Sequence, residues 1–221
     1  MAKTITTAPL CVVGQMADEA STPLELNTSS PEDSCCPTCR RANRSRQVIA
    51  PPHLHALTSL RAIAMAHPAF GDLGLIMPSD PSDALTRWEY WCTPTNAWTF
   101  ATTGGNGVHY SLVETEGSVS EQSPVVMTVP MCDSPNHIVG ADLREFLALG
   151  LPYGWFGLEQ MAYSSSWWED HADWEREGPM SPERRAVIAE LQERLGLVGW
   201  EDVPDRLLHL SVLSEGLRAE G

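Results

Sequence analysis

Apolar residues recur at helical spacing along much of the chain, and the first such segment follows Pro51 and Pro52. Proline is tolerated in the first turn of a helix, where its missing N–H has no intrahelical partner to lose. Leu57, Leu60 and Ala64 then follow at intervals of three and four residues, which places them on one helical face. The pattern predicts a helix that starts near residue 51 and ends before the next His-Pro pair.

An alternating pattern then replaces the helical one and predicts a β-hairpin. Trp98, Phe100 and Thr102 alternate along one face of the first strand, and residues 108–112 alternate on the return. The Gly-Gly-Asn-Gly sequence between them supplies the positive φ angles that a tight turn requires. A further strand is expected over 125–129, which has a proline at each end.

From Val139 the pattern turns helical. Leu143, Phe146 and Leu147 form an apolar stripe on one side of a helix. Gly150 follows this stripe at the position of a left-handed cap, where glycine is the usual residue. Pro152 is suited to start the next helix.

The C-terminal part predicts two more helices and completes the fold class. Ser181 is a good N-cap with Pro182 as the first helical residue, and Gly196 is suited to end that helix. A last helix is expected over 204–217. The order of helix, strands and helices predicts an α+β fold, with a small antiparallel sheet packed with several helices.

The first 46 residues differ from the rest of the chain in composition. Residues 1–46 are rich in Ser, Thr and Pro and show little periodicity, which predicts a flexible, disordered N-terminal extension. Residues 47–221 are expected to form a single α+β domain with a helical C-terminal region. This length is enough to bury a substantial core.

The net charge of the chain is −15, and this acidity makes some classes of binding partner less favourable than others. Residues 1–46 are neutral, whereas residues 47–163 hold eleven acidic and three basic residues, and residues 164–221 hold thirteen and six. Nucleic acid is an unlikely partner, since duplex binding needs cations that displace counterions. No stretch reaches about 20 apolar residues, so no membrane contact is expected. Without a signal-like start or a disulfide framework, the expected location is cytoplasmic.

One segment contains residues with metal-ligand spacing. Two residues separate Cys36 from Cys39, which lets both thiolates reach one tetrahedral zinc ion. His53 and His55 follow at the interval of a two-Cys-two-His finger, but one residue separates them where three to five are usual. Since only half of the ligand set is well spaced, reduced cysteines in a mobile tail, with no cofactor, are the leading interpretation, and a zinc site is the alternative.

A second segment combines tryptophans with carboxylates. It contains Trp167, Trp168, Glu169, Asp170 and Asp173. Tryptophan is enriched at binding hot spots, and carboxylates around it steer a basic partner. The alternative is that the tryptophans pack in the core while the acids face solvent, and the spacing permits both. These five residues are the candidate partner-binding site.

Residues 98–163 resemble the SUKH superfamily. The resemblance rests on WTFATTGGNGVHYSLV, PVVMTVPM, IVGADLREFLALG and YGWFGLEQMAY, which share a Gly-Gly turn between strands and a following helix. Members of that superfamily include bacterial immunity proteins that neutralise toxins. The motifs are turns and core positions, with no catalytic signature. The resemblance implies a bacterial protein that binds another protein.

Three hypotheses about function follow from the sequence. The leading one is a non-enzymatic cytoplasmic binding protein, an immunity-type inhibitor of a basic toxin, in keeping with the acidity of residues 47–221. The second is a zinc-binding regulatory protein that uses Cys36 and Cys39. The third is an enzyme of unrecognised family from a biosynthetic cluster, with His109 or His171 as acid or base; no catalytic residue is assigned.

Overall fold

The computed structural model describes residues 54–79, 85–88, 90–163 and 181–214. All of them belong to one compact unit of the chain. The predicted flexible extension, residues 1–46, lies outside the described residues.

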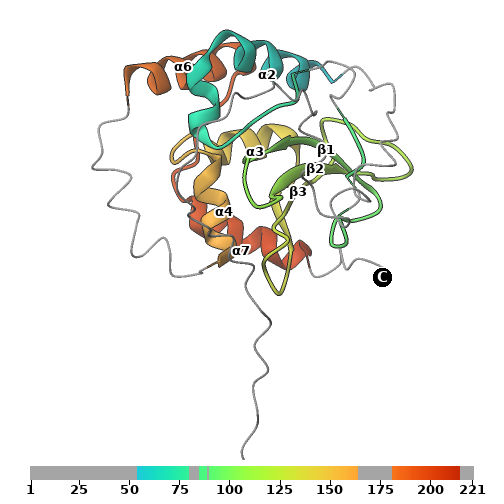
Figure 1. Cartoon of the computed structure of the whole chain (residues 1–221). Coiled ribbons are helices and arrows are strands. Elements are labelled where there is room, and N and C mark those ends of the chain that lie inside the picture. Colours follow the sequence, from blue (N-terminus) through green and yellow to red (C-terminus); the bar gives the residue numbers. More distant parts are fainter. Residues whose placement is uncertain (1–53, 80–84, 89, 164–180, 215–221) are drawn as a thin grey trace, which may run out of the picture. The chain divides into compact units, whose positions relative to one another are not determined.

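Four antiparallel strands form one sheet, and their order in space follows their order in the chain (Figure 1). They are β1 (Ala97–Thr102), β2 (His109–Val113), β3 (Val125–Thr128) and β4 (Asn136–Gly140). The first three confirm the predicted hairpin and the predicted strand after it. The sequence pattern did not predict β4, and the expected start of the helical pattern at Val139 is wrong, because Val139 and Gly140 belong to this strand. Its adjacent apolar residues Ile138 and Val139 are both buried, so the alternation that marks a half-exposed strand is absent.

The hairpin turn has the backbone geometry that its sequence predicts. Asn106 and Gly107 both have positive φ angles, of 53° and 75°. Gly104 at the start of the turn has a φ of 86°. Glycine adopts such angles without steric cost, and asparagine tolerates them better than most residues.

One detail of the hairpin differs from the prediction. A β-bulge interrupts the pairing between Thr99 and Ala101, so that Ala101 pairs with Tyr110 and Thr102 pairs with His109. Directly paired residues share a face of the sheet. The expectation that Thr102 continues the apolar face of the first strand is therefore wrong, because the extra residue of the bulge reverses the alternation.

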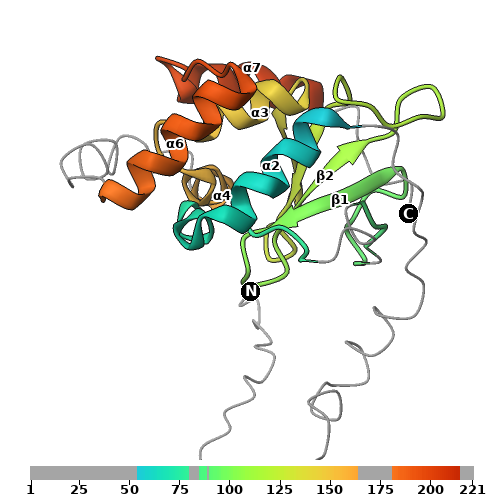
Figure 2. The same cartoon turned by 90° about the horizontal axis from the view of Figure 1, so that it is seen from above.

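Helices precede and follow the sheet, which confirms the α+β class. They are α2 (His55–Ala66), the 3₁₀ helix η2 (Pro68–Leu73), α3 (Leu143–Gly150), α4 (Trp155–Tyr163), α6 (Pro182–Leu195) and α7 (Val203–Ser214). Helices α2 and α6 lie side by side, as both views show (Figures 1 and 2). Helices α3 and α7 contact β4. Among the described residues, none of the helices has the length and apolar character needed to cross a membrane.

Aromatic side chains join α3 and α4 to one face of the sheet. The ring of Phe146 lies 5.7 Å from that of Phe100, 4.9 Å from that of Tyr110 and 6.2 Å from that of Trp155. All four side chains are buried. The Tyr110 hydroxyl donates a hydrogen bond to the Trp155 carbonyl oxygen over 2.8 Å, so this apolar core also satisfies its polar group.

The connection between α3 and α4 corrects two predictions. Gly150 is not a left-handed cap: it is the last residue of α3, and Leu151 after it is also in the right-handed helical region. A Cβ atom on Gly150 would lie 2.3 Å from the Trp155 indole, so close packing explains the glycine. Helix α4 starts at Trp155 and not at Pro152, because Gly154 with a φ of 78° redirects the chain.

The predicted ends of α6 are confirmed. The Ser181 hydroxyl accepts a hydrogen bond from the Arg184 backbone N–H over 3.2 Å, and Pro182 is the first helical residue. Gly196 ends the helix with a φ of 58°. The last helix, α7, starts at Val203, within one residue of the prediction.

Candidate functional site

The described part of the chain contains two of the candidate residues, His55 and His109. His55 is the first residue of α2 and its side chain is exposed. The other residues lie outside the described ranges: Cys36, Cys39, His53, Trp167, Trp168, Glu169, Asp170, Asp173 and His171. Among the described residues, no three His, Cys, Asp or Glu side chains are grouped to hold a metal ion. The zinc site and the partner-binding segment stay predictions.

His109, the described candidate for acid–base chemistry, is fully buried on the sheet. Its Nδ1 lies 2.7 Å from the Gly107 carbonyl oxygen, which can only accept, so we assign the ring proton to Nδ1. Nε2 then accepts from the Thr93 hydroxyl over 3.0 Å. Burial lowers the pKa of His109 from 6.5 to about 4. With both nitrogens occupied, the neutral ring is a structural element.

The face of the sheet that carries His109 also carries hydroxyl groups in mutual hydrogen bonds. Thr99 and Ser111, both buried, bond to each other over 2.9 Å. Thr128 donates to the Asn136 side-chain oxygen over 2.8 Å. The Asn136 amide in turn donates to the carbonyl oxygen of Cys92 over 2.9 Å. These bonds satisfy the buried polar groups and attach the segment before β1 to the sheet.

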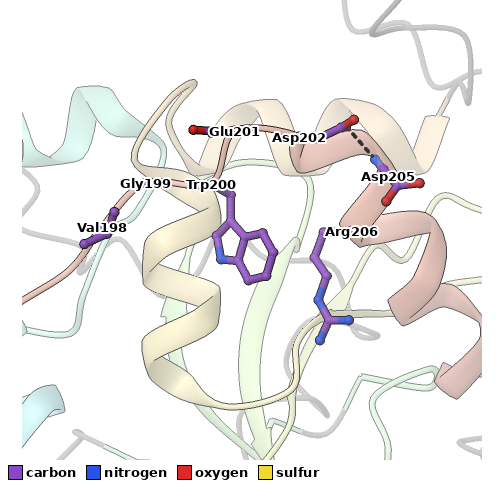
Figure 3. A pocket seen from close by; sticks show the side chains of 7 residues that line it. All are labelled: Val198, Gly199, Trp200, Glu201, Asp202, Asp205 and Arg206. Atoms are coloured by element: carbon purple, nitrogen blue, oxygen red, sulfur yellow. Dashed lines mark hydrogen bonds between the residues drawn. The ribbon is translucent and has the colours of Figure 1, made fainter.

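An open groove of about 550 Å³ lies at the start of α7 (Figure 3). We call it the acidic groove and define it by the residues that line it: Val198, Gly199, Trp200, Glu201, Asp202, Asp205 and Arg206. These residues include no Ser, Thr, Tyr, Cys, His or Lys, so the lining offers no hydroxyl, thiol or amine nucleophile.

The positions of these residues follow from the helix boundaries. Gly196 ends α6, and the buried Val203 fixes the first turn of α7. Asp202 caps α7, since its side-chain oxygen accepts from the Asp205 backbone N–H over 3.0 Å. The short connection between the two helices leaves Trp200 39% exposed. The groove therefore presents an accessible indole between two fixed helix ends.

Arg206 is the cation of the groove, and Glu145 on α3 compensates its charge. The Arg206 guanidinium donates to both oxygens of Glu145, over 2.8 and 3.2 Å. Glu145 also accepts from the Ala141 backbone N–H over 2.6 Å, while its own N–H donates to the Asp142 side chain over 2.7 Å. This reciprocal cap of α3 holds the carboxylate in place. Arg206 is thus a fixed, neutralised wall of the groove.

The remaining charges of the groove are negative. Glu201, Asp202 and Asp205 are all exposed. Asp205 lies 3.4 Å from His209 Nδ1, and both side chains are mostly exposed, so water screens this pair. The Arg206 guanidinium carbon lies 5.6 Å from the centre of the Trp200 ring, and the two side chains point the same way (Figure 3). The groove therefore combines an aromatic surface with three carboxylates.

Sequence reasoning missed this groove, although a signal for it exists. The triplet Trp-Glu-Asp occurs twice, at residues 168–170 and 200–202. The first occurrence belongs to the candidate partner-binding segment, and the second lines the acidic groove. A search for a recurrence of the same residue combination would have found the second copy.

Comparison with known proteins found no matching family model, and neither a curated protein nor a solved structure matches the chain. The resemblance of residues 98–163 to the SUKH superfamily stays a prediction. The acidic groove is therefore interpreted from its own geometry and charge.

Proposed function

We propose that this chain is a non-enzymatic binding protein and that its acidic groove takes a cationic side chain from a partner protein. One observation carries the proposal: the partly exposed Trp200 and three exposed carboxylates line one groove, whose arginine is already paired with Glu145. A partner with cationic side chains fits this combination, because a guanidinium or ammonium group can stack on an aromatic ring or pair with a carboxylate.

The whole-chain charge supports the same proposal. A protein with a net charge of −15 attracts a cationic partner over distances comparable to the Debye length. Carboxylates around a contact raise the association rate more than the final affinity. The aromatic contact adds about 0.5–2 kcal/mol where the cation is desolvated. The field would thus speed the encounter, and the groove would hold the partner.

More specifically, we propose that the protein is an immunity-type inhibitor of a basic toxin in the bacterial cytoplasm. The resemblance of residues 98–163 to the SUKH superfamily supports this form, as does the acidity of the chain. A toxin that acts on nucleic acid must itself carry a cationic surface, which an acidic inhibitor can cover. The buried thiol of Cys92, which is free in the described part of the chain, is compatible with a reducing compartment.

The test is the affinity for a fluorescently labelled octa-arginine peptide, measured by anisotropy at low salt. The variant Glu201→Gln/Asp202→Asn/Asp205→Asn removes the groove charges, and asparagine preserves the cap of α7. We expect it to bind about tenfold more weakly, which corresponds to about 1.4 kcal/mol spread over three charges.

The matched control is Glu116→Gln/Asp133→Asn/Glu193→Gln, which removes the same charge from three exposed residues outside the groove. We expect this control to change the affinity less than about twofold. An equal loss of affinity in both variants would show that the peptide senses only net charge, and the groove would not be the binding site.

A further inference from the structure

A second, smaller pocket lies at α2, η2 and residues 75–79, outside the acidic groove. Its volume is about 300 Å³, at the lower end of the range for small-molecule sites. Most of its lining is apolar and includes Met65, Phe70, Ile76 and Met77, with Arg61 from α2 among them. Met65 is 76% exposed, so part of this apolar lining is in contact with solvent.

Arg61 lines this pocket although only 8% of its surface is exposed. Its Nη2 donates to the backbone oxygens of Pro78 and Ser79, over 3.0 and 3.4 Å. Its Nη1 is buried and has no hydrogen-bond partner among the described residues. A buried donor without a partner costs about 1–3 kcal/mol, and a buried cation without an anion costs more. Among the residues that the structure describes, Nη1 of Arg61 therefore lacks an acceptor with negative charge.

One carboxylate, that of Glu190, contacts a residue of this pocket, but it already accepts hydrogen bonds from two side chains. Glu190 on α6 accepts from Nε2 of His67, a lining residue, over 2.5 Å. Its other oxygen accepts from Arg194 over 2.9 Å. The hydrogen bond from His67, with that from Arg194, lowers the pKa of Glu190. Glu190 thus has two donors of its own and does not compensate Arg61 in the described structure.

We infer that this pocket binds a small organic carboxylate with an apolar body. The carboxylate would accept from Nη1 of Arg61, because a charge-assisted bond to a guanidinium is stronger than a bond between neutral groups. The apolar body would contact Met65, Met77 and Phe70, and flexible methionines adapt to chains of different shape. The charge requirement is opposite to that of the acidic groove, so the two sites are independent.

The test uses octanoate and its uncharged analogue octanamide as probes of wild-type protein labelled with ¹³C at the methionine methyl groups. We expect octanoate to shift the Met65 and Met77 signals saturably and to bind at least about tenfold more tightly than octanamide. Met131, exposed and outside the pocket, is the internal control and should not move. No shift with octanoate, or equal binding of both probes, would overturn the inference.

Two variants assign the binding to Arg61. Arg61→Met should remove the preference for octanoate, while Arg185→Gln, at an exposed position of α6, should keep it. If Arg61→Met does not fold, the comparison of the two probes on wild-type protein still decides the question.

A carboxylate of the chain itself is the alternative occupant of the pocket. Asp80 and Asp83 follow Ser79 in the sequence and lie outside the described residues. If octanoate binds only to the variant Asp80→Asn/Asp83→Asn and not to wild type, the acceptor is internal, and the inference of an external ligand is wrong. Equal binding to wild type and to this variant supports the inference.

Discussion

Burial keeps the ring of His109 neutral, because it lowers the pKa of the imidazole. Its two ring nitrogens bond to Gly107 and Thr93, and the rings of Trp88 and Tyr90 lie 5.0 and 5.7 Å from its own. Protonation would reverse the hydrogen bond with Thr93, because Nε2 would become the donor, and would place a charge in a buried environment next to two aromatic rings. The residue therefore holds the turn of the hairpin against the segment before β1, and it links stability to pH.

The first prediction is a loss of stability in mild acid that depends on His109. Its pKa is about 4 in the folded protein and 6.5 ordinarily, so the unfolded chain takes up the proton first as pH falls. The contribution of the neutral ring is complete above pH 6.5 and is lost between pH 6.5 and about 4. Between pH 7 and pH 5 this loss is about 2 kcal/mol.

Urea unfolding at both pH values measures this loss. His109→Gln does not titrate, so the difference between pH 7 and pH 5 should be about 2 kcal/mol smaller in this variant. All other ionisable groups are the same in both proteins and cancel in the comparison. An equal pH dependence of wild type and variant would contradict this role of His109.

Within the hairpin turn, Gly107 is required both by the backbone conformation and by the close approach of Tyr90. Gly107 has a φ of 75°, and a Cβ atom there would lie 3.0 Å from the Tyr90 hydroxyl oxygen. Two residues earlier, Gly105 has no positive φ, and a Cβ atom at that position would meet no other atom within 4 Å. Gly105 is therefore a matched control position for substitutions at Gly107.

The second prediction compares valine at these two positions. Gly107→Val should destabilise the protein by about 1–3 kcal/mol, because a β-branched residue is forced into a left-handed conformation and against the Tyr90 ring. Gly105→Val should cost less than about 1 kcal/mol. Thermal and urea unfolding of both variants measure the difference. Equal effects would place the constraint elsewhere in the turn.

The sequence predicts those elements whose conformation is determined by residues only a few positions apart. The hairpin turn and the two ends of α6 depend on residues whose backbone preferences act within a few positions. β4 was missed because burial on both faces removes the alternation, and it is α3 and α7 that contact this strand. The role of Gly150 was misjudged because it depends on Trp155, a contact that no local rule contains.

At the scale of the whole molecule, the sequence predicted the kind of candidate site but not this location. Tryptophan among carboxylates was recognised at residues 167–173, which lie outside the described residues. The acidic groove has the same combination at Trp200, but its meaning depends on Glu145, which is distant in sequence and neutralises Arg206. Only the fold brings this pair together, so composition alone could not show that the groove is left with net negative charge.

Binding of a cationic partner to the acidic groove can be followed in the tryptophan indole spectrum during titration with octa-arginine. The chain has eight tryptophans, and Trp200→Phe assigns the relevant signal in the ¹H–¹⁵N spectrum. Trp91 is 77% exposed and lies outside the groove, so it reports nonspecific contact. We expect the Trp200 signal to shift saturably while the Trp91 signal stays in place. A constant Trp200 signal, with shifts at Trp167 or Trp168 instead, would contradict the assignment of binding to the acidic groove.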